Sequence, residues 1–294
     1  MLEFRDITIN DRERITSALR QSDFMGCEYS FANNMAWKRL AGSKIAFYRD
    51  FYICCAFETD DDIPHFIFPA GSGDYSEVIN EMKKFSSSLG KPLILTGVTE
   101  PTLSVLIELF PEQFTVGCDR NNSDYIYLST DLIELKGKKY HSKRNHLAKL
   151  KNYTYSPVTE NDFDECIFFC TQSYNDKYDE PDHSSIAEQY AINTYFSYFE
   201  ELRLRGGIIR IDGKIAAVTI GEQLNSSTFC VHIEKADTSF PGIYASINKL
   251  FAENEAKNLK YINREEDLGI EGLRKSKLSY HPAFLLDKYT VTFK

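Results

Sequence analysis

The sequence lacks any uncharged apolar run near the length of about 20 residues that a helix needs to cross a bilayer. The segment that follows Met1 mixes polar and apolar residues and has no apolar stretch typical of a signal peptide. We therefore expect a cytoplasmic protein without membrane insertion. The aromatic fraction of 14%, carried by 21 Phe and 18 Tyr, predicts bulky cores.

Three common catalytic motifs are also absent: a Walker phosphate loop, a G-x-S-x-G nucleophile elbow and an H-E-x-x-H metal motif. Three large enzyme classes are thereby excluded. The 43 acidic residues outnumber the 34 Lys and Arg, so the formal net charge is −9. A surface of this charge repels nucleic acid, so we predict no DNA partner, and any polyanion must find a local basic patch.

Cysteine occurs seven times, an odd count that fits free thiols in a reducing compartment better than a disulfide framework. Cys54 and Cys55 are adjacent in an apolar run. Cys166 and Cys170 share one helix face, but no second ligand pair follows at the spacing of a metal site. We therefore predict that they belong to the core and that the chain has no metal site.

The length of 294 residues fits two domains of roughly 130 to 150 residues. Both halves follow the order helix, helix, three strands, helix, strand, helix, two strands. An antiparallel meander followed by a crossover helix and a parallel strand predicts an α/β fold with mixed sheets, not a doubly wound one. We predict domains over residues 1–130 and 153–294, joined by a basic linker helix over 131–152.

Two closing strands are expected to complete each domain. In the first domain they are predicted at Gln113–Val116 and Asp124–Ser129, and in the second at Phe284–Asp287 and Tyr289–Phe293. The second domain is predicted to begin with a helix at Glu160–Ser173.

This order of elements resembles that of tandem N-acetyltransferase-like (GNAT) domains. Three stretches narrow the resemblance: DLIELKGKKYHSKRN (131–145), HIEKA (232–236) followed by FPGIY (240–244), and YINREEDLG (261–269) leading to GLRKSKLSYHP (272–282). They are similar to the C-terminal catalytic domain family of phosphatidylglycerol lysyltransferases, over nearly the whole chain. The resemblance implies two tandem GNAT-like acyl-CoA N-acyltransferase domains.

Members of that family fused to membrane segments transfer an aminoacyl group from a charged tRNA to a lipid headgroup. This chain resembles the free-standing branch, which lacks the membrane domain. The resemblance therefore implies acyl or aminoacyl transfer, with acyl-CoA or aminoacyl-tRNA as donor substrate and no permanently bound cofactor. The acceptor would be an amine or hydroxyl of a soluble molecule. The alternative is a binding or regulatory module that kept the fold and lost the chemistry.

In this superfamily, backbone N–H groups between the third meander strand and the next helix bind the donor pyrophosphate. In the second domain the equivalent donor-binding residues are Lys235, Phe240, Pro241, Gly242, Ile243 and Tyr244. The alternative is that Pro241 and Gly242 simply begin a helix. In the first domain the loop at 70–75 contains Asp74, which would repel a phosphate and suits an N-cap, so this domain is predicted to be the scaffold.

The basic linker has seven Lys or Arg and no acid among the sixteen residues 136–151. Lys143, Arg144 and Asn145 within it match the family motif and are predicted to bind phosphate or acceptor. Arg274 and Lys275 form a second basic cluster with the same predicted role. The alternatives are a solvated connecting helix for the linker and a positively charged last helical turn for the second cluster.

An amine acceptor must lose a proton in order to attack an acyl carbon, and a carboxylate near the strand ends can take it. Glu234 is the first candidate for this base, and Glu265 and Asp267 follow it because ligands gather at strand carboxyl ends. In this superfamily a tyrosine often protonates the leaving group, and Tyr280 lies in the matching region. The alternative for each is a hydrogen-bonding or surface role, and His232 is predicted to be a satisfied buried histidine.

Overall fold

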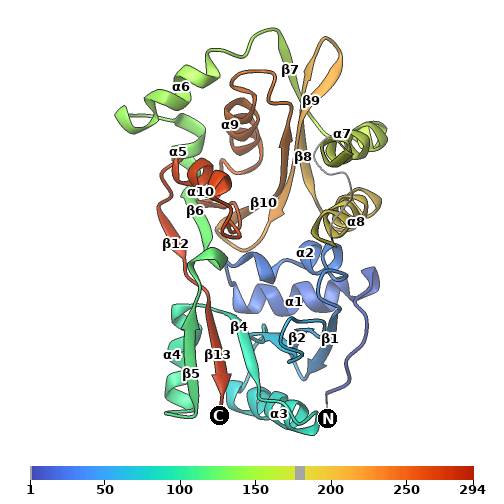
Figure 1. Cartoon of the computed structure of the whole chain (residues 1–294), viewed down its shortest axis with the longest axis vertical. Helices are drawn as coiled ribbons and strands as arrows, with labels where there is room; N and C mark the ends of the chain where they lie inside the picture. Colours follow the sequence, from blue (N-terminus) through green and yellow to red (C-terminus); the bar gives the residue numbers. More distant parts are fainter. Residues whose placement is uncertain (1, 176–182) are drawn as a thin grey trace. The chain divides into compact units, whose positions relative to one another are not determined.

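The computed structural model describes residues 2–175 and 183–294. The chain divides into two compact units (Figure 1). The first consists of Met1–Asp124 together with Leu286–Lys294, and the second of Tyr125–Leu285. Among the described helices, none is long and apolar enough to cross a membrane.

The first unit is built on a six-stranded mixed sheet of order β1-β2-β3-β4-β13-β5. Strands β1 to β3 form an antiparallel meander, and β3 pairs in parallel with β4 after the crossover helix α3 (Tyr75–Ser88). The strands are β1 (Ser43–Tyr48), β2 (Phe51–Ala56), β3 (His65–Ile67), β4 (Ile94–Val98), β5 (Phe114–Cys118) and β13 (Tyr289–Phe293).

The first unit's helices are α1 (Arg12–Ser22), α2 (Phe31–Ala36), α3 (Tyr75–Ser88) and α4 (Glu100–Leu109), with short 3-10 turns at Ile9–Asp11, Cys27–Tyr29 and Arg120–Asn122. The Asp74 carboxylate accepts the backbone N–H groups of Ser76 and Glu77 and so caps α3, as predicted. The core of this unit is rich in aromatic side chains, and β13 contributes Val291 and Phe293 to it.

The second unit is built on a seven-stranded sheet of order β12-β6-β11-β10-β9-β8-β7, in which β10 and β11 form a parallel pair. The strands are β6 (Asp124–Leu128), β7 (Tyr153–Pro157), β8 (Arg205–Ile211), β9 (Lys214–Gln223), β10 (Thr228–Ala236), β11 (Tyr261–Asn263) and β12 (Phe284–Leu286). The prediction of a mixed-sheet α/β fold is confirmed.

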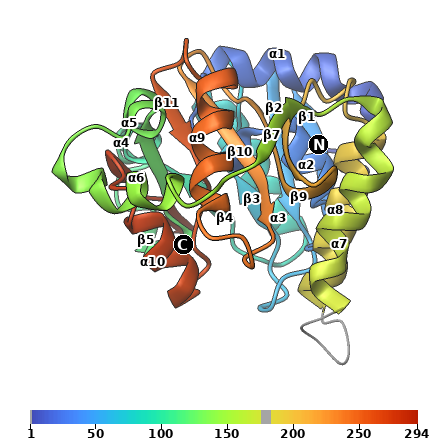
Figure 2. The ribbon, with the colours of Figure 1, turned by 90° about the horizontal axis from the view of Figure 1, so that it is seen from above.

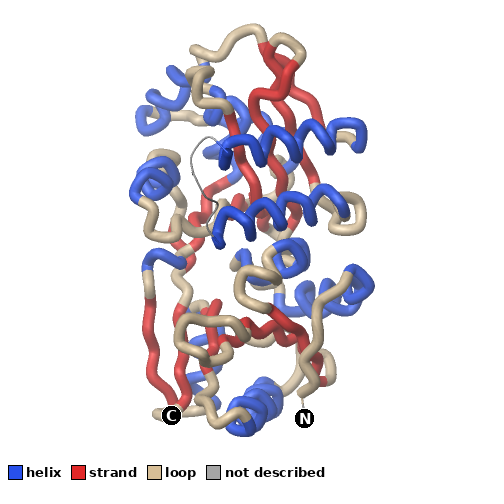
Figure 3. Tube along the Cα trace, turned by 45° about the vertical axis from the view of Figure 1, so that its right-hand side comes forward, coloured by secondary structure: helices blue, strands red, loops and turns tan. Residues whose placement is uncertain are grey.

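The second unit's helices are α5 (Ser129–Glu134), α6 (His141–Leu147), α7 (Phe163–Asn175), α8 (His183–Ser197), α9 (Ile243–Glu255) and α10 (Glu271–Leu278), with 3-10 turns at Lys138–Tyr140 and Glu160–Asp162. Helices α7 and α8 pack together on one face of the sheet (Figure 3), and α9 covers the opposite face (Figure 2). The face under α9 carries the buried aromatic core formed by Tyr125, Tyr127, Phe229 and Phe251.

The structure differs from the predicted domain limits at both ends. Strand β6 pairs with β11 of the second sheet, whereas the C-terminal strand β13 pairs with β4 and β5 of the first (Figure 1). Each unit thus receives a closing strand that the order of elements assigned to the other. The predicted linker over 131–152 folds as α5 and α6 within the second unit, and strand β7 follows it, which the sequence analysis missed.

Candidate functional site

The parallel strands β10 and β11 diverge in the middle of the second sheet. They are paired only from Thr228 to Cys230 on β10 and from Tyr261 to Asn263 on β11, and β10 then continues to Ala236. We call the opening beyond the last pair the fork. Carboxyl ends of parallel strands at such a point are where open α/β sheets bind ligands.

A β-bulge in β10 decides which side chains face each side of the fork. The ring of His232 is stacked on Tyr195 of α8, with 5.6 Å between the ring centroids. Glu234, only two residues further on, instead accepts a hydrogen bond from Asn248 of α9 on the opposite face. The bulge lies between Val231 and Ile233 and leaves His232 as one extra, unpaired residue, which reverses the alternation of the strand before Glu234.

On the α9 side of the fork, Glu234 forms a buried ion pair with Arg264, which follows β11. The distance from Arg264 Nη2 to Glu234 Oε1 is 2.8 Å, and the two side chains are 10% and 11% exposed. The second carboxylate oxygen accepts the Asn248 amide at 3.3 Å. Arg264 Nη1 is also buried, and no hydrogen-bond partner for it exists among the described residues. A buried guanidinium nitrogen without a partner suits a polar group on a bound ligand.

Lys143 approaches the same place from α6. Its ammonium lies 3.5 Å from the centroid of the Tyr280 ring, and the Arg264 guanidinium lies 5.0 Å from that centroid. Two cations thus lie near one buried aromatic ring, beside a single carboxylate. Burial and the neighbouring charge of Arg264 lower the pKa of Lys143 to about 8, while Glu234 acts in the opposite direction. We call Lys143, Glu234, Arg264 and Tyr280 the fork site.

Replacing Lys143 by Met should change how stability depends on pH. The folded pKa is about 8 and the ordinary value is 10.5, so between them the unfolded wild type binds more protons than the folded one. Wild-type stability should therefore rise through this window relative to the variant. Loss of the ammonium–ring contact, worth about 0.5–2 kcal/mol, lowers the stability of the variant at pH values at which wild-type Lys143 is charged. Urea unfolding across the window tests this, and a pH-independent difference would contradict it.

Tyr280 is suited to donating a proton or hydrogen bond. The side chain is buried, and burial raises the pKa of its hydroxyl well above the ordinary value, so the hydroxyl stays protonated at neutral pH. Its backbone carbonyl accepts the hydroxyl of Tyr140 at 3.0 Å, which fixes the segment that carries it. The predicted residues Glu234, Tyr280 and Lys143 thus come together.

The predicted donor loop leads from β10 into α9. Gly242 caps that helix with a left-handed φ of 91°. A Cβ at this position would lie 2.0 Å from the carbonyl oxygen of His146, so the glycine is required because α6 crosses the start of α9 there. The close approach is to protein backbone, which favours the alternative reading of this glycine. At the start of α9, the N–H group of Ile243 donates a hydrogen bond to the carbonyl group of Phe240.

The remaining residues of the predicted donor loop lie in different surroundings. Lys235 forms an ion pair of 2.8 Å with Glu188 of α8, so its charge is already matched. Ile243 and Phe240 pack in an apolar cluster with Ile209 of β8 and Ile247 of α9. Pro241 and Tyr244 are exposed at the surface. Their predicted contact with a donor stays a prediction.

Asp267 and Arg274, predicted as catalytic and phosphate-binding residues, bind each other. Arg274 donates from Nε and Nη2 to the two carboxylate oxygens, both at 2.8 Å, and Tyr125 donates its hydroxyl to the same carboxylate. Asp267 is fully buried. This arrangement favours a structural role that holds α10 against the loop after β11. Lys275 is exposed in the last turn of α10, where a positive charge is favourable.

Arg144 and Asn145 are adjacent to Lys143 in the sequence, but their side chains contact other groups. Arg144 Nη1 donates to the carbonyl groups of Leu135 and Gly137 and so closes the turn before α6. Asn145 Nδ2 lies 3.2 Å from His141 Nε2 on the exposed side of the helix. Of the three predicted phosphate-binding residues in this segment, Lys143 is the one at the fork site.

Glu265 lies on the other side of the fork, away from Glu234. Its Oε1 is 2.9 Å from His232 Nδ1, and Glu222 Oε1 is 3.2 Å from His232 Nε2. His232 is therefore buried with a carboxylate at each ring nitrogen, which agrees with the prediction of a satisfied histidine.

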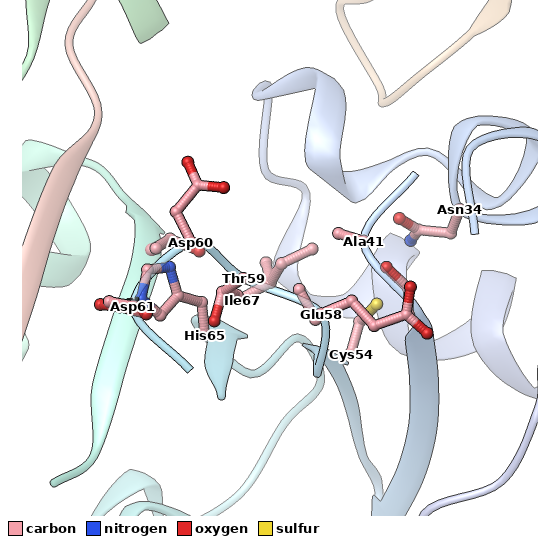
Figure 4. Close-up of a pocket in the computed structure, with 12 residues that line it drawn as sticks. Asn34, Ala41, Cys54, Glu58, Thr59, Asp60, Asp61, His65 and Ile67 are labelled. Carbon is pink, nitrogen blue, oxygen red and sulfur yellow. Dashed lines mark hydrogen bonds and ion pairs between the residues drawn. The ribbon is translucent and has the colours of Figure 1, made fainter. Parts of the chain in front are cut away.

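The first unit has a cavity of about 530 Å³ above its meander (Figure 4). The charged side chains around it are Glu58, Asp60, Asp61 and His65. Asp61 accepts from His65 and from the backbone of Ile63, and so closes the turn beside the cavity. An acidic lining repels phosphate, so this cavity is a poor donor site, which is consistent with a scaffold role for the first unit.

Comparison with known structures defines the class as tandem GNAT-like. A tandem GNAT protein from the clavulanic acid biosynthesis pathway superposes with a TM-score of 0.50 at 9% identity, covering 99% of this chain and 98% of that one. L-PGS from Bacillus licheniformis superposes with a TM-score of 0.68 at 13% identity, covering 97% and 92%. These likenesses establish the fold.

A comparison of the sequence with protein-family models identifies the family. The family model "Phosphatidylglycerol lysyltransferase, C-terminal" matches residues 19–292, so the chain belongs to this family, as the resemblance implied. A conserved protein of unknown function from Bacteroides thetaiotaomicron is 38% identical over 100% of both chains, with a TM-score of 0.92. No curated protein matches the chain significantly. Family and fold are those of GNAT-like acyl- or aminoacyltransferases.

Two residues of the fork were missed by the sequence analysis. Arg264 directly precedes Glu265 in the quoted 261–269 stretch, and it is the first residue after β11, so the rule that placed Glu265 and Asp267 applies to it as well. Asn248 is a polar residue on the buried, otherwise mostly apolar face of α9. A polar residue among apolar positions of a helix can indicate a functional site.

Proposed function

We propose that this protein transfers an acyl or aminoacyl group to an amine or hydroxyl of an acceptor, with the fork site as its active centre. The observation that carries the proposal is the pair of cations, Lys143 and Arg264, near the Tyr280 ring beside Glu234. Membership of the lysyltransferase family supports the reaction class. The acceptor that we expect from the sequence is a soluble molecule.

In the proposed mechanism, Lys143 and Arg264 hold a phosphate of the donor, because both are cations and Arg264 has a buried N–H group without a partner. Glu234 is held in place by its ion pair with Arg264 and takes the proton that the acceptor loses as its nitrogen or oxygen bonds to the acyl carbon. The bond from that carbon to the donor's sulfur or oxygen then breaks. Tyr280 supplies a proton to the leaving group, since its hydroxyl remains protonated.

Two donor classes carry the required phosphate: acyl-CoA and the 3′ end of an aminoacyl-tRNA. Thermal unfolding of the purified protein with CoA, acetyl-CoA, charged tRNA and uncharged tRNA separates them. A ligand at a hundred times its Kd should stabilise the protein by about 2.7 kcal/mol. We expect Lys143→Ala to abolish the shift. Lys149→Ala is the matched control, because Lys149 is an exposed lysine of the same basic segment.

A shift with CoA supports an acyl-CoA transferase, and a shift with charged tRNA alone supports aminoacyl transfer. No shift with any of the four would contradict the proposal. It would favour the second candidate, a binding or regulatory module that kept the fold. The observation in favour of that candidate is the start of α9, where the His146 backbone lies against Gly242 at the place where a donor would be expected.

A further inference from the structure

A cluster of side chains on the α8 side of the fork has the composition of a transition-metal site. Cys230 and His232 come from β10, and Glu265 follows β11. Glu265 Oε1 lies 2.9 Å from His232 Nδ1 and 3.8 Å from Cys230 Sγ, and all three potential ligand atoms lie within 4.8 Å of one another. The proposed acyl transfer makes no use of this cluster.

The backbone holds these three side chains in place. Cys230 and His232 both direct their side chains at Glu265, and the bulge between Val231 and Ile233 makes His232 the extra residue of the strand. Glu265 has a left-handed φ of 56°, a conformation that costs a non-glycine residue energy and that tends to occur at functional sites. Its N–H group donates to Asn263 Oδ1 at 2.7 Å, which fixes this turn. The turn directs the Glu265 carboxylate at His232.

Two further residues, one at the Nε2 atom and one on the face of the ring, orient the imidazole of His232. Glu222 Oε1 lies 3.2 Å from Nε2, and Tyr195 is stacked on the ring with an interplanar angle of 7°. When one ring nitrogen of a histidine binds a metal, a carboxylate outside the site can accept the proton of the other nitrogen, and Glu222 is placed to do so at Nε2. This is the usual outer partner of a metal-bound histidine. Nδ1, which faces Cys230 and Glu265, is therefore the nitrogen available for a metal.

Burial distinguishes this cluster from an exposed group of acids. The side chain of His232 is 0% exposed and that of Glu265 is 22% exposed, and Cys230 is fully buried. Glu265 therefore provides the route by which an ion could enter. The face of the fork that carries the cluster is opposite to the one that carries Glu234, so the two groups of residues can be tested separately.

We propose that Cys230, His232 and Glu265 bind one Zn²⁺ ion. Thiolate, imidazole and carboxylate are the ligands that Zn²⁺ takes, at about 2.0–2.3 Å, and tetrahedral ligands at those lengths lie roughly 3.3–3.8 Å apart. The Cys230–Glu265 separation already fits, and the His232–Glu265 contact must open by about half an ångström. Binding releases the thiol proton and any proton on Nδ1 to solvent. Three protein ligands leave the fourth position to water.

The test measures metal directly and does not depend on any transferase activity. The protein is stripped with a chelator, Zn²⁺ is restored, and bound metal is counted by elemental analysis. Co²⁺ is then used as a spectroscopic substitute, because a tetrahedral thiolate site gives intense visible bands and a sulfur-to-metal absorption. All variants are made in a Cys118→Ser background, since Cys118 is an exposed thiol. We expect one Zn²⁺ per chain.

Cys230→Ser should remove the sulfur-to-metal absorption, whereas Cys166→Ser, a matched loss of a buried thiol in α7, should leave it intact. Glu222→Gln should weaken Zn²⁺ binding by about 10- to 100-fold, the usual effect of removing an outer partner. Failure of the unsubstituted ligand set to bind Zn²⁺ or to give the Co²⁺ spectrum would overturn the proposal, and so would an unchanged spectrum in Cys230→Ser. The cluster would then be a histidine hydrogen-bonded between two carboxylates.

Discussion

Replacing Glu234 by Gln is expected to lower kcat for acyl transfer by about 10²- to 10⁴-fold, the usual contribution of a general base. Gln has the same shape, and its amide oxygen can still accept the 2.8 Å hydrogen bond from Arg264, but it cannot take a proton. The measurement is single-turnover transfer from whichever donor stabilises the protein, at saturating donor.

The same variant distinguishes two roles for this carboxylate. If Glu234 only positions Arg264, the loss should appear as a higher KM for the donor, with kcat nearly unchanged, because the phosphate contact weakens and the chemistry does not. Asn248→Ala is the control, since it removes the other hydrogen bond to Glu234 but leaves the carboxylate charge and the ion pair. An unchanged kcat in Glu234→Gln would exclude the base role.

Replacing Lys288 by Met is expected to destabilise the protein by about 3–5 kcal/mol, the usual cost of removing one partner of a buried ion pair. Lys288 Nζ lies 2.6 Å from Asp124 Oδ1 and 2.5 Å from Glu28 Oε1, and the Lys288 and Asp124 side chains are 5% and 0% exposed. The variant leaves the Asp124 charge buried without its cation. Urea unfolding with a single fitted slope measures the loss.

A double-mutant cycle tests the cause of that loss. Asp124→Asn removes the unpaired charge, and the amide oxygen can still accept the Cys27 N–H group, which now lies 2.9 Å from Asp124 Oδ2. We expect the Lys288→Met/Asp124→Asn double variant to recover much of the stability lost in the single variant. A Lys288→Met cost below about 1 kcal/mol, or no recovery in the double variant, would refute the argument.

The candidate site was partly visible in the sequence, and Lys143 shows why. Lys143 and Leu147 are four residues apart in α6, so helix geometry places them on one face. The sequence analysis recognised the basic block as a whole and predicted the same role for Lys143, Arg144 and Asn145. That Lys143 alone turns inward, while Arg144 binds backbone carbonyls, depends on the surface against which α6 packs.

The contacts between residues on either side of the fork could not be predicted from the sequence for a related reason. Glu234 and Arg264 are 30 residues apart, and Lys143 and Tyr280 are still further apart in the sequence. The bulge in β10 reverses the alternation between His232 and Glu234, and no period in the sequence marks it. Cys230, His232 and Glu265 likewise have no sequence spacing of a metal site, because the parallel pairing of β10 with β11 brings them together.

The sequence by itself determined the α/β class, the order of elements and the family, because hydrophobic periodicity, turn residues and local motifs are properties of short segments. Only the tertiary structure decided which sheet each closing strand joins. The apolar pattern of β13 would suit either core, and its placement in the first follows from burial of Val291 and Phe293 there and from the Lys288 ion pair. Contacts between distant segments, which no local pattern encodes, made that choice.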